Sequence, residues 1–530
     1  MTSVLRSDRL RRLLLLAAIV APVVLAVLGW RAAPPMVNPD SAMGFLTWES
    51  HRAGAPWNHL RSPDPANLAR DREEFLAWWS PAQYEVPGLW RNLGANWGQS
   101  IVLTCLLASW LQLGGCWLLG RSVGLSPHAT GWFTAISGLQ WHTFYGFGHF
   151  RGGDVLLIAF APWALLWAWT VRRRPYVFLL TAPLIVLGGQ YLKLSAVLFS
   201  LPVVAAAALG NAWELRQRRA LAAAWGVAAA MLLAAAWGVF SLGFLRQGPT
   251  PGDVGAFSGS LVSVLGFALA APWLAATGAG SLIGRLAWMA GTEAEVLWRN
   301  AGWYVAPLAL AAGWAAARYL LRTLPADLRR GVALITLGGV ILFVLVLLRG
   351  SAVALEDRFL RPTAVALLLV LAFTLDHPGR TRALLIPIAL LCIAGFGMMS
   401  AAQRTTGLLH LQSRGHSGLA QHDLDPAALR ELSRLDRAPS PHSRLVYVPF
   451  PGAALELPRQ RVLVTDDFMF EREHRWQGRV PELIAALPAT MEQDGRGARI
   501  RRRFVDYSPA EWQATRAGDW YFWTATTSRP

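Results

Sequence analysis

Long apolar runs dominate the pattern of hydrophobic and polar positions along the chain. A helix needs roughly 20 apolar residues to cross a hydrocarbon core of about 30 Å, and runs near this length recur up to residue 399. The pattern predicts about eleven membrane spans, each bounded by polar residues or prolines. They cover residues 13–30, 101–120, 129–147, 155–171, 176–191, 194–210, 220–245, 301–321, 332–348, 363–375 and 383–399. The predicted fold class is a mainly α, polytopic bundle of transmembrane helices.

Arginines in the connecting turns predict the orientation of this bundle. Cytoplasmic turns of membrane proteins carry an excess of Lys and Arg. Four arginines precede the first run, and others occupy alternate turns, at positions 121, 172–174, 216–219, 322–330 and 380–382. No small-residue cleavage site follows the first run before Pro34, which favours a retained anchor over a signal peptide. The N-terminus is therefore predicted inside, and an odd number of crossings predicts the C-terminus outside.

The apolar segment 261–284 does not fit this alternation. A single crossing there would place the arginines at 329 and 330 on the wrong side. Pro272, Gly278, Gly280 and Gly284 favour a broken helix, which is tolerated at membrane depth where protein or a wet cavity covers it. We interpret the segment as re-entrant or interfacial, with two crossings and a tight turn as the alternative.

Two polar pieces lie outside the predicted bundle, which is assigned to residues 1–400. One is the first outer loop, 31–98, where charged residues before Phe75 and Trp79 favour helices lying on the membrane surface. The other is the tail, 401–530, predicted to be a small extracytoplasmic α/β domain. Segments 445–450, 461–466 and 519–527 are interpreted as strands, and 481–495 as a helix. Such a tail more often acts as a lid, docking surface or scaffold than as a catalytic domain.

Composition and charge agree with a membrane assignment. The chain is 54% hydrophobic and only 15% charged. Its formal charge of +17 would suggest a nucleic-acid binder in a soluble chain, but the basic residues flank apolar runs, where they meet anionic lipid headgroups. We therefore expect membrane lipids, and no nucleic acid, as partners. The three cysteines and the scattered histidines predict neither a disulfide framework nor a metal site, and we expect no cofactor.

Two aspartates near the predicted outer face are candidates for chemistry. Asp40 lies shortly after the first span, where its carboxylate is placed to accept a proton from an acceptor hydroxyl. Asp154 starts the fourth span beside Arg151 and His149, a grouping suited to a phosphate. Helix capping is the alternative role for both aspartates. His142, inside a predicted span, is expected to hydrogen-bond a neighbouring helix.

Basic residues predicted at the same face suit a lipid phosphate. Lys193, the only lysine of the chain, lies between two spans, where it either pairs with a phosphate or reaches towards water. Glu356, Asp357, Arg358 and Arg361 precede the tenth span, and arginines there suit a phosphate or pyrophosphate oriented by the acids. An ordinary charged loop is the alternative. The convergence of all these residues on one face favours a substrate-binding site.

This layout resembles the GT-C superfamily of integral-membrane glycosyltransferases over residues 1–400. The shared features are a cytoplasmic N-terminus, a long first outer loop with surface helices, many further spans and a polar outer tail. Asp40, in the sequence Asn-Pro-Asp, matches the placement of the superfamily's loop-one aspartate. Ser41 follows it, whereas many members carry a second adjacent acid.

The resemblance implies transfer of a hexosyl or pentosyl group from a polyprenyl-phosphate donor to a glycan, lipid or protein acceptor. The reaction would occur with inversion at the outer face of a membrane, and short arginine-rich turns suit a bacterial inner membrane. Asp40 would be the catalytic base, and Arg151, Lys193, Arg358 and Arg361 would bind the lipid phosphate. Alternatives are a transporter or flippase for a lipid-linked glycan, and a noncatalytic envelope assembly protein.

Overall fold

The chain forms two compact units, each made of segments distant in sequence. The computed structural model describes residues 8–76, 79–216, 218–240, 261–292, 296, 311, 324–348, 356–376, 382–411, 414–438, 444–464, 473–478 and 482–526. Unit 1 comprises Met1–Leu25, Cys105–Tyr145 and Gly153–Ala402. Unit 2 comprises Ala26–Thr104, Gly146–Gly152 and Gln403–Pro530. We describe each unit separately.

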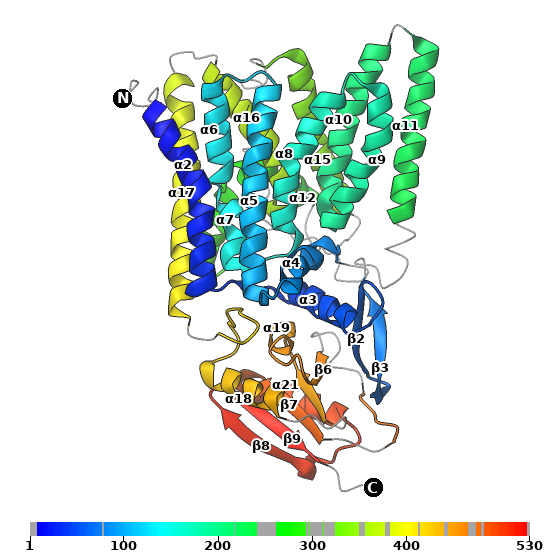
Figure 1. Ribbon diagram of the computed structural model, residues 1–530, viewed down its shortest axis with the longest axis vertical. Coiled ribbons are helices and arrows are strands. Elements are labelled where there is room, and N and C mark those ends of the chain that lie inside the picture. The colour runs from blue at the N-terminus through cyan, green and yellow to red at the C-terminus, as the bar shows by residue number, and fades with distance from the viewer. Residues whose placement is uncertain are drawn as a thin grey trace. The chain divides into compact units, whose positions relative to one another are not determined.

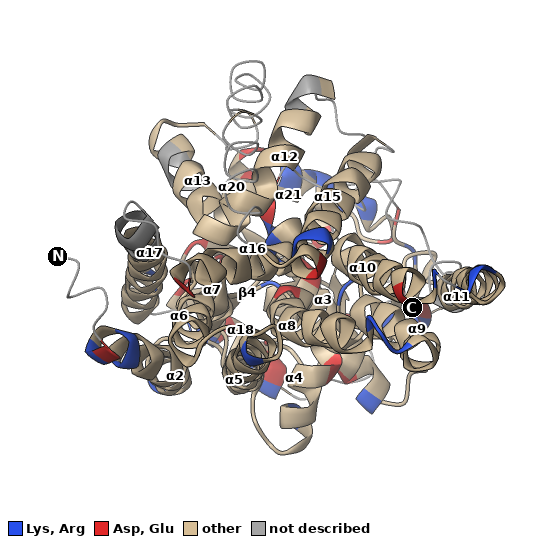
Figure 2. Ribbon diagram, turned by 90° about the horizontal axis from the view of Figure 1, so that it is seen from above, with Lys and Arg blue, Asp and Glu red and all other residues tan. Residues whose placement is uncertain are grey.

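Unit 1 is built from helices, which Figure 1 shows as a bundle of long ribbons. The helices that lie wholly or for the larger part in it are α2 (Asp8–Arg31), α5 (Trp97–Ser122), α6 (Pro127–Gly138), α7 (Trp141–Gly148), α8 (Gly153–Val171), α9 (Pro175–Leu192), η1 (Leu194–Ala196), α10 (Val197–Leu215), α11 (Arg219–Phe240), α12 (Leu261–Thr277), α13 (Ala279–Met289), α15 (Ala326–Leu348), η4 (Asp357–Leu360), α16 (Arg361–Phe373), η5 (Thr374–Asp376) and α17 (Arg382–His410). Viewed along the helices, the ribbons are mostly tan because they carry few charged residues (Figure 2).

The predicted fold class is confirmed. Nine helical segments of the described residues are long and apolar enough to cross a membrane, and they coincide with nine of the predicted spans. The protein is therefore an integral membrane protein. Apart from residue 311, the predicted span 301–321 lies outside the described residues, as does the end of the span predicted at 220–245.

Helix α16 lies at the centre of unit 1, and small residues let its neighbours pack closely. Residues 361–370 of α16 are all buried. Helices α10 and α15 pack against each other, and a Cβ on Gly338 of α15 would lie 3.1 Å from the Pro202 side chain of α10. Close approach through small residues is the usual way in which helices pack in membranes, where apolar lipid removes the hydrophobic driving force.

The span predicted at 129–147 is wrong as one continuous helix. Helix α6 ends at Gly138 and α7 begins at Trp141. At the break, Gln112 donates to the Ser137 carbonyl at 2.8 Å, and Gln140 donates to the Ala276 carbonyl at 2.7 Å. The break was not predicted because the residues around it are as apolar as those of the flanking helices and include no proline.

The broken helix predicted in segment 261–284 is present. Helix α12 ends at Thr277 and α13 begins at Ala279, with Gly278 between them at φ +74°. Glycine adopts this left-handed conformation without the steric cost of a Cβ. The re-entrant course of the segment remains a prediction.

Within unit 2, the first loop folds as helix, hairpin and helix. Its elements are β1 (Met36–Val37), α3 (Pro39–Arg52), β2 (His59–Asp64), β3 (Asn67–Phe75) and α4 (Ala82–Asn92). The helix predicted from the charges before Phe75 is wrong, because residues 67–75 form the second strand of the β2–β3 hairpin. Arg61 and Glu73 face each other across it, 2.7 Å apart. The charged residues before Phe75 had suggested one face of a helix. They lie on strand β3, where charges can pair with residues of the neighbouring strand.

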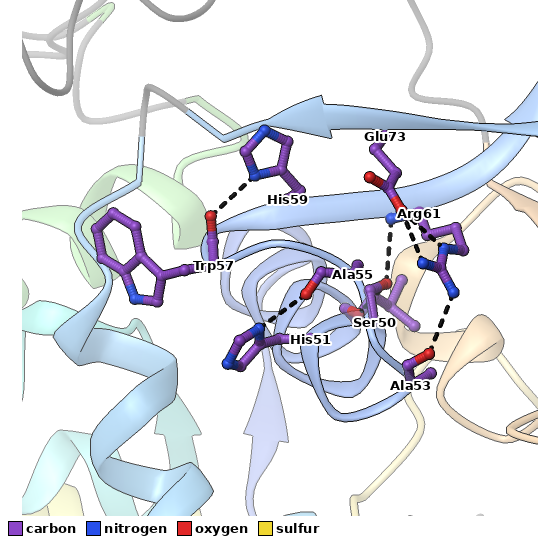
Figure 3. A network of polar contacts seen from close by, with 9 residues as sticks. Ser50, His51, Ala53, Ala55, Trp57, His59, Arg61 and Glu73 are labelled. Atoms are coloured by element: carbon purple, nitrogen blue, oxygen red, sulfur yellow. Dashed lines mark hydrogen bonds and ion pairs between the residues drawn. The ribbon is translucent and has the colours of Figure 1, made fainter.

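Polar contacts attach this hairpin to the end of α3 (Figure 3). The Arg61 amide donates to the Ser50 hydroxyl at 3.2 Å, and its guanidinium donates to the Ala53 carbonyl at 3.1 Å. The Nδ1 atom of His51 lies 2.9 Å from the backbone carbonyl oxygen of Ala55. In the same way, Nδ1 of His59 lies 2.8 Å from the carbonyl oxygen of Trp57. These two histidines therefore stabilise turns.

The tail of unit 2 contains a five-stranded mixed sheet in the order β6-β5-β7-β9-β8. Strands β5 (Arg444–Val448), β6 (Arg461–Val464) and β7 (Glu482–Pro488) are parallel, and β8 (Trp512–Ala517) and β9 (Trp520–Ala525) add an antiparallel hairpin. Helices α18 (Pro426–Arg437), α19 (Pro451–Ala454), α20 (Ala489–Gln493) and α21 (Arg496–Arg503) flank it. The small α/β fold predicted for the tail is confirmed, whereas the boundary at residue 400 remains a prediction.

The helix predicted at 481–495 is mostly wrong, because residues 482–488 form the central strand β7 and only Ala489–Gln493 are helical. Leu483 and Ala485 pack on one face of the sheet, and Ile484 and Ala486 on the other. A strand covered on both faces is a continuous apolar run without alternation, which periodicity cannot distinguish from a short buried helix.

A buried glutamate fixes the loop before α18. The Glu456 side chain is 1% exposed. It accepts hydrogen bonds from the Ser417 amide at 3.2 Å and from Gln421 at 2.8 Å, and also from the Ser417 hydroxyl. His416 Nδ1 lies 3.0 Å from Glu456 Oε2. One carboxyl group therefore holds three neighbouring side chains.

Glu456→Ala is expected to destabilise the protein by about 3 kcal/mol or more, because several buried donors lose their acceptor at once. Thermal unfolding of the purified protein measures the effect. Glu431→Ala is the matched control, since its ion pair with the exposed Arg434 should contribute less than about 1 kcal/mol. Equal losses in the two variants would contradict this role for Glu456.

His416 makes stability depend on pH. The hydrogen bond to Glu456 raises the pKa of His416 above its usual value, and partial burial opposes the effect. A raised folded-state pKa adds stability that is fully present below the unfolded pKa of about 6.5 and is lost as pH rises through the folded value. We expect the unfolding temperature to fall as pH rises above about 6.5. The dependence should weaken in His416→Gln, and an unchanged slope would refute this source.

Candidate functional site

Asp154 and Lys193, predicted separately, form an ion pair in unit 1. Asp154 is the second residue of α8, and Lys193 lies at the corner between α9 and η1. Their side chains are only 7% and 18% exposed. Gly153 makes the approach possible, because a Cβ there would overlap the Leu192 carbonyl oxygen and lie 3.0 Å from the Lys193 Cβ. The helix start also favours a carboxylate at Asp154.

Phe359 joins this pair to the charged run at 356–361. Lys193 Nζ lies 5.5 Å from the centre of the Phe359 ring, and the Arg358 guanidinium lies 4.9 Å from it. Such distances allow cation–π attraction. Arg358 Nε also lies 2.7 Å from Glu356 Oε2. The 3-10 helix η4, which carries Asp357, Arg358 and Phe359, therefore presents its charges beside the Asp154–Lys193 pair.

Arg361 and Asp357 form another buried ion pair in this group. Their charged atoms are 3.9 Å apart, and their side chains are 7% and 11% exposed. The Arg361 guanidinium lies 5.4 Å and 6.0 Å from the ring centres of Trp141 and Tyr145 in α7. On the other side, a Cβ on Gly280, in the first turn of α13, would overlap the Asp357 carboxylate. The break at Gly278 thus places a helix N-terminus against this acid.

We call the residues Asp154, Lys193, Glu356, Asp357, Arg358 and Arg361 the unit 1 cluster. Several buried polar atoms in and beside it have no hydrogen-bond partner among the described residues: Asp154 Oδ2, Asp357 Oδ2, Arg361 Nε and both ring nitrogens of His142. The hydrogen bond predicted for His142 is therefore not observed in that part of the chain. Buried polar groups normally have partners, so this cluster suits a ligand that brings both hydroxyl donors and anionic acceptors.

Asp40 lies in the first turn of α3, in unit 2. Asn38 caps the helix, since its side-chain oxygen accepts from the Ser41 amide at 3.2 Å. The side-chain amide nitrogen of Asn38 also donates to Asp40 Oδ2 at 3.1 Å. The capping role considered for Asp40 therefore belongs to Asn38, which orients the Asp40 carboxylate.

The Arg151 segment lies beside this helix start within unit 2. Strand β4 (His149–Phe150) pairs in parallel with β1, and the backbone N–H of Asn38 donates to the Phe150 carbonyl at 3.3 Å. Gly152 follows at φ +59°, and a Cβ there would overlap Gln83 and lie 3.1 Å from the Ser41 hydroxyl. The pairing thus brings the chain at Arg151 next to the chain at Asp40.

His149 is uncharged at neutral pH. Burial lowers its pKa to about 4, helped by the positive charges of Arg151 and Arg404 and by His422. Arg404, at the end of α17, was not predicted as a site residue because it continues the helical pattern of the last span. Sequence analysis also missed Trp141, Tyr145 and Phe359, since aromatic residues in apolar runs give no separate signal.

The structure therefore brings together six predicted residues in unit 1, while Asp40 and Arg151 belong to unit 2. Among the described residues, no group of three or more His, Cys, Asp or Glu side chains is arranged to hold a metal ion.

The fold has counterparts among solved structures. No protein-family profile matches the sequence, and no curated protein matches it. ArnT from Cupriavidus metallidurans in the apo state superposes with a TM-score of 0.55 at 12% identity, over 96% of this chain and 97% of ArnT. The same protein bound to undecaprenyl phosphate gives 0.54 at 12% identity, over 97% and 98%.

A mycobacterial arabinofuranosyltransferase, AftD, gives a TM-score of 0.50 at 16% identity. The match covers 98% of this chain but 40% of AftD. The ArnT match extends over nearly the whole of both chains. The resemblance inferred from the layout is thereby confirmed at the level of the fold: this chain shares the fold of ArnT and AftD.

Proposed function

We propose that this protein is a membrane glycosyltransferase that moves a sugar from a polyprenyl-phosphate donor to an acceptor. The observation that carries the proposal is the unit 1 cluster. Three segments far apart in sequence supply three basic and three acidic side chains, four of which are largely buried inside a membrane protein. Ionisable groups are costly there and usually serve function. The similarity to ArnT bound to undecaprenyl phosphate supports the lipid class of the donor.

The unpartnered atoms of the cluster suit both halves of such a donor. Sugar hydroxyls donate hydrogen bonds, which Asp154 Oδ2 and Asp357 Oδ2 can accept. Phosphate oxygens accept them, and Arg361 Nε can donate one.

The proposed reaction is a single displacement at the anomeric carbon. The acceptor hydroxyl loses its proton to Asp40, and its oxygen forms a bond to that carbon. The bond from the carbon to the phosphate oxygen breaks, and the polyprenyl phosphate leaves as an anion. Lys193, Arg358 and Arg361 stabilise this leaving group, and Arg151 is a further candidate. Displacement from the opposite face inverts the sugar carbon.

The proposed orientation follows from the arginine-rich turns. We place the N-terminus in the cytoplasm, the tail outside, and the chain in a bacterial inner membrane, with a glycan, lipid or protein acceptor on the outer side. The proposed division is a membrane domain of residues 1–400 followed by an extracytoplasmic domain of residues 401–530.

Native mass spectrometry of the detergent-purified protein tests the donor class. We expect a co-purified polyprenyl phosphate or polyprenyl-phosphate sugar, whose mass identifies the sugar after the lipid is subtracted. The adduct should then transfer its sugar to an added acceptor in a radiolabel assay. If the protein bound the lipid-linked sugar and moved it across vesicle membranes but did not transfer the sugar, a flippase would be favoured. Neither adduct, transfer nor translocation would favour a noncatalytic assembly role and refute the proposal.

A further inference from the structure

A cleft in unit 1 lies at the other end of α8 from Asp154. It has a volume of about 810 Å³ and is lined by residues of α5, α8, α10, α15 and α16. Helix α8 has 19 residues, so its two ends are separated by roughly 27 Å at 1.5 Å per residue. The cleft is therefore distinct from the unit 1 cluster. Its volume falls in the range of about 300–1,000 Å³ typical of small-molecule sites.

The walls of the cleft are apolar, whereas its rim is basic. Leu165, Ala207 and Ile335 represent the walls. Arg172, Arg173, Arg216 and Arg330 line the rim, together with the acids Glu214 and Asp327. Arg173 pairs with Asp327 at 3.0 Å. A ligand that matches this lining has an apolar body and an anionic head.

Tryptophans hold the rim arginines in place. The Arg172 guanidinium lies 3.3 Å from the centre of the Trp169 ring. Those of Arg216 and Arg330 lie 4.2 Å and 4.6 Å from the Trp213 ring. Arg172 Nε is buried without a hydrogen-bond partner among the described residues. Stacked guanidinium groups lose less freedom on binding, and their planar donors match a phosphate.

We infer that this cleft binds one anionic phospholipid, with its phosphate on Arg172, Arg216 and Arg330 and part of an acyl chain against the apolar walls. Lipid is favoured over a soluble anion because the walls are apolar and tryptophans flank the rim, as they do at membrane interfaces. The arginine-rich turns that form this rim are those that the positive-inside pattern places at the cytoplasmic leaflet, where anionic lipids gather.

Lipid exchange followed by native mass spectrometry tests the inference. The delipidated protein is titrated with phosphatidylglycerol, phosphatidylcholine or a soluble glycerophosphate. We expect one tightly held phosphatidylglycerol, at least tenfold weaker phosphatidylcholine, and negligible glycerophosphate. The double variant Arg172→Gln/Arg216→Gln should lose about tenfold or more in phosphatidylglycerol affinity. The control is Arg329→Gln, an exposed arginine in the first turn of α15 that does not line the cleft.

Equal retention of the two lipids, or an unchanged double variant, would overturn the inference. Tight binding of glycerophosphate alone would show a free-anion site and overturn it as well. Asp40→Asn should leave phosphatidylglycerol affinity unchanged, because Asp40 belongs to unit 2 and does not line the cleft. Failure of the proposed glycosyltransferase function is therefore distinguishable from failure of the lipid site.

Discussion

Asp40→Asn should reduce sugar transfer by about 10²–10⁴-fold, the usual contribution of a general base. Asparagine keeps the shape of the side chain but cannot take a proton from the acceptor hydroxyl. Asn38 caps α3 in place of Asp40, so the helix should still form. The measurement is the initial rate of transfer from the donor found by mass spectrometry, at matched expression and unfolding temperature.

Two controls separate catalysis from folding in this experiment. Asn38→Ala removes the helix cap and should lower stability by about 1 kcal/mol, with a smaller loss of rate than Asp40→Asn. Asp64→Asn changes another carboxylate of the same loop, whose Oδ1 accepts from the Ala66 amide in a turn, and should keep the wild-type rate. A wild-type rate in Asp40→Asn would remove Asp40 from the mechanism.

Arg358→Ala and Arg361→Lys are expected to lower donor kcat/KM by about 10²–10³-fold, the range for losing one donor to a developing anion. Acceptor KM should change little. Lysine is chosen at 361 because the residue is buried beside Asp357, and removing one partner of a buried ion pair is strongly destabilising. Lysine keeps the charge but loses the planar fork. Steady-state rates with donor and acceptor varied in turn measure the effect.

Arg219→Gln is the matched control for these two variants. Arg219 is exposed at the first residue of α11 and should not affect either substrate. If Arg358→Ala and Arg361→Lys weakened donor and acceptor equally, the phosphate role would be wrong. If both proteins unfolded at a lower temperature without a change in donor dependence, the cluster would be structural.

Membrane character could be predicted from the sequence because it depends on local properties. Nine of the eleven predicted spans coincide with helices of the described residues that are long and apolar enough to cross a membrane. Backbone groups in lipid must bond within their own segment, so an apolar run has few other choices. Prediction from local sequence failed where a segment had a partner distant in the chain. Residues 67–75 and 482–488 pair with other strands. Gln140 donates to the Ala276 carbonyl at the break between α6 and α7.

The individual charged residues of the candidate site were also visible in the sequence, because ionisable groups beside apolar runs are conspicuous. Asp154, Lys193 and the charges at 356–361 were all predicted from their position at the ends of spans. Their pairing was not, because 39 residues separate Asp154 from Lys193 and periodicity carries no information about contacts between helices. Asp40 was predicted, but its orientation by Asn38 was not.

The sequence by itself determined that the chain is a polytopic membrane protein, where nine of its spans lie and which charged residues stand at the ends of those spans. Only the tertiary structure decided that Lys193 meets Asp154 and Phe359, that the N-terminus of α13 lies against Asp357, and that arginines and tryptophans surround a cleft lined by α5, α8, α10, α15 and α16. The physical reason is that hydrophobicity acts on each segment independently, whereas a site requires side chains from several segments to meet at distances set by helix packing.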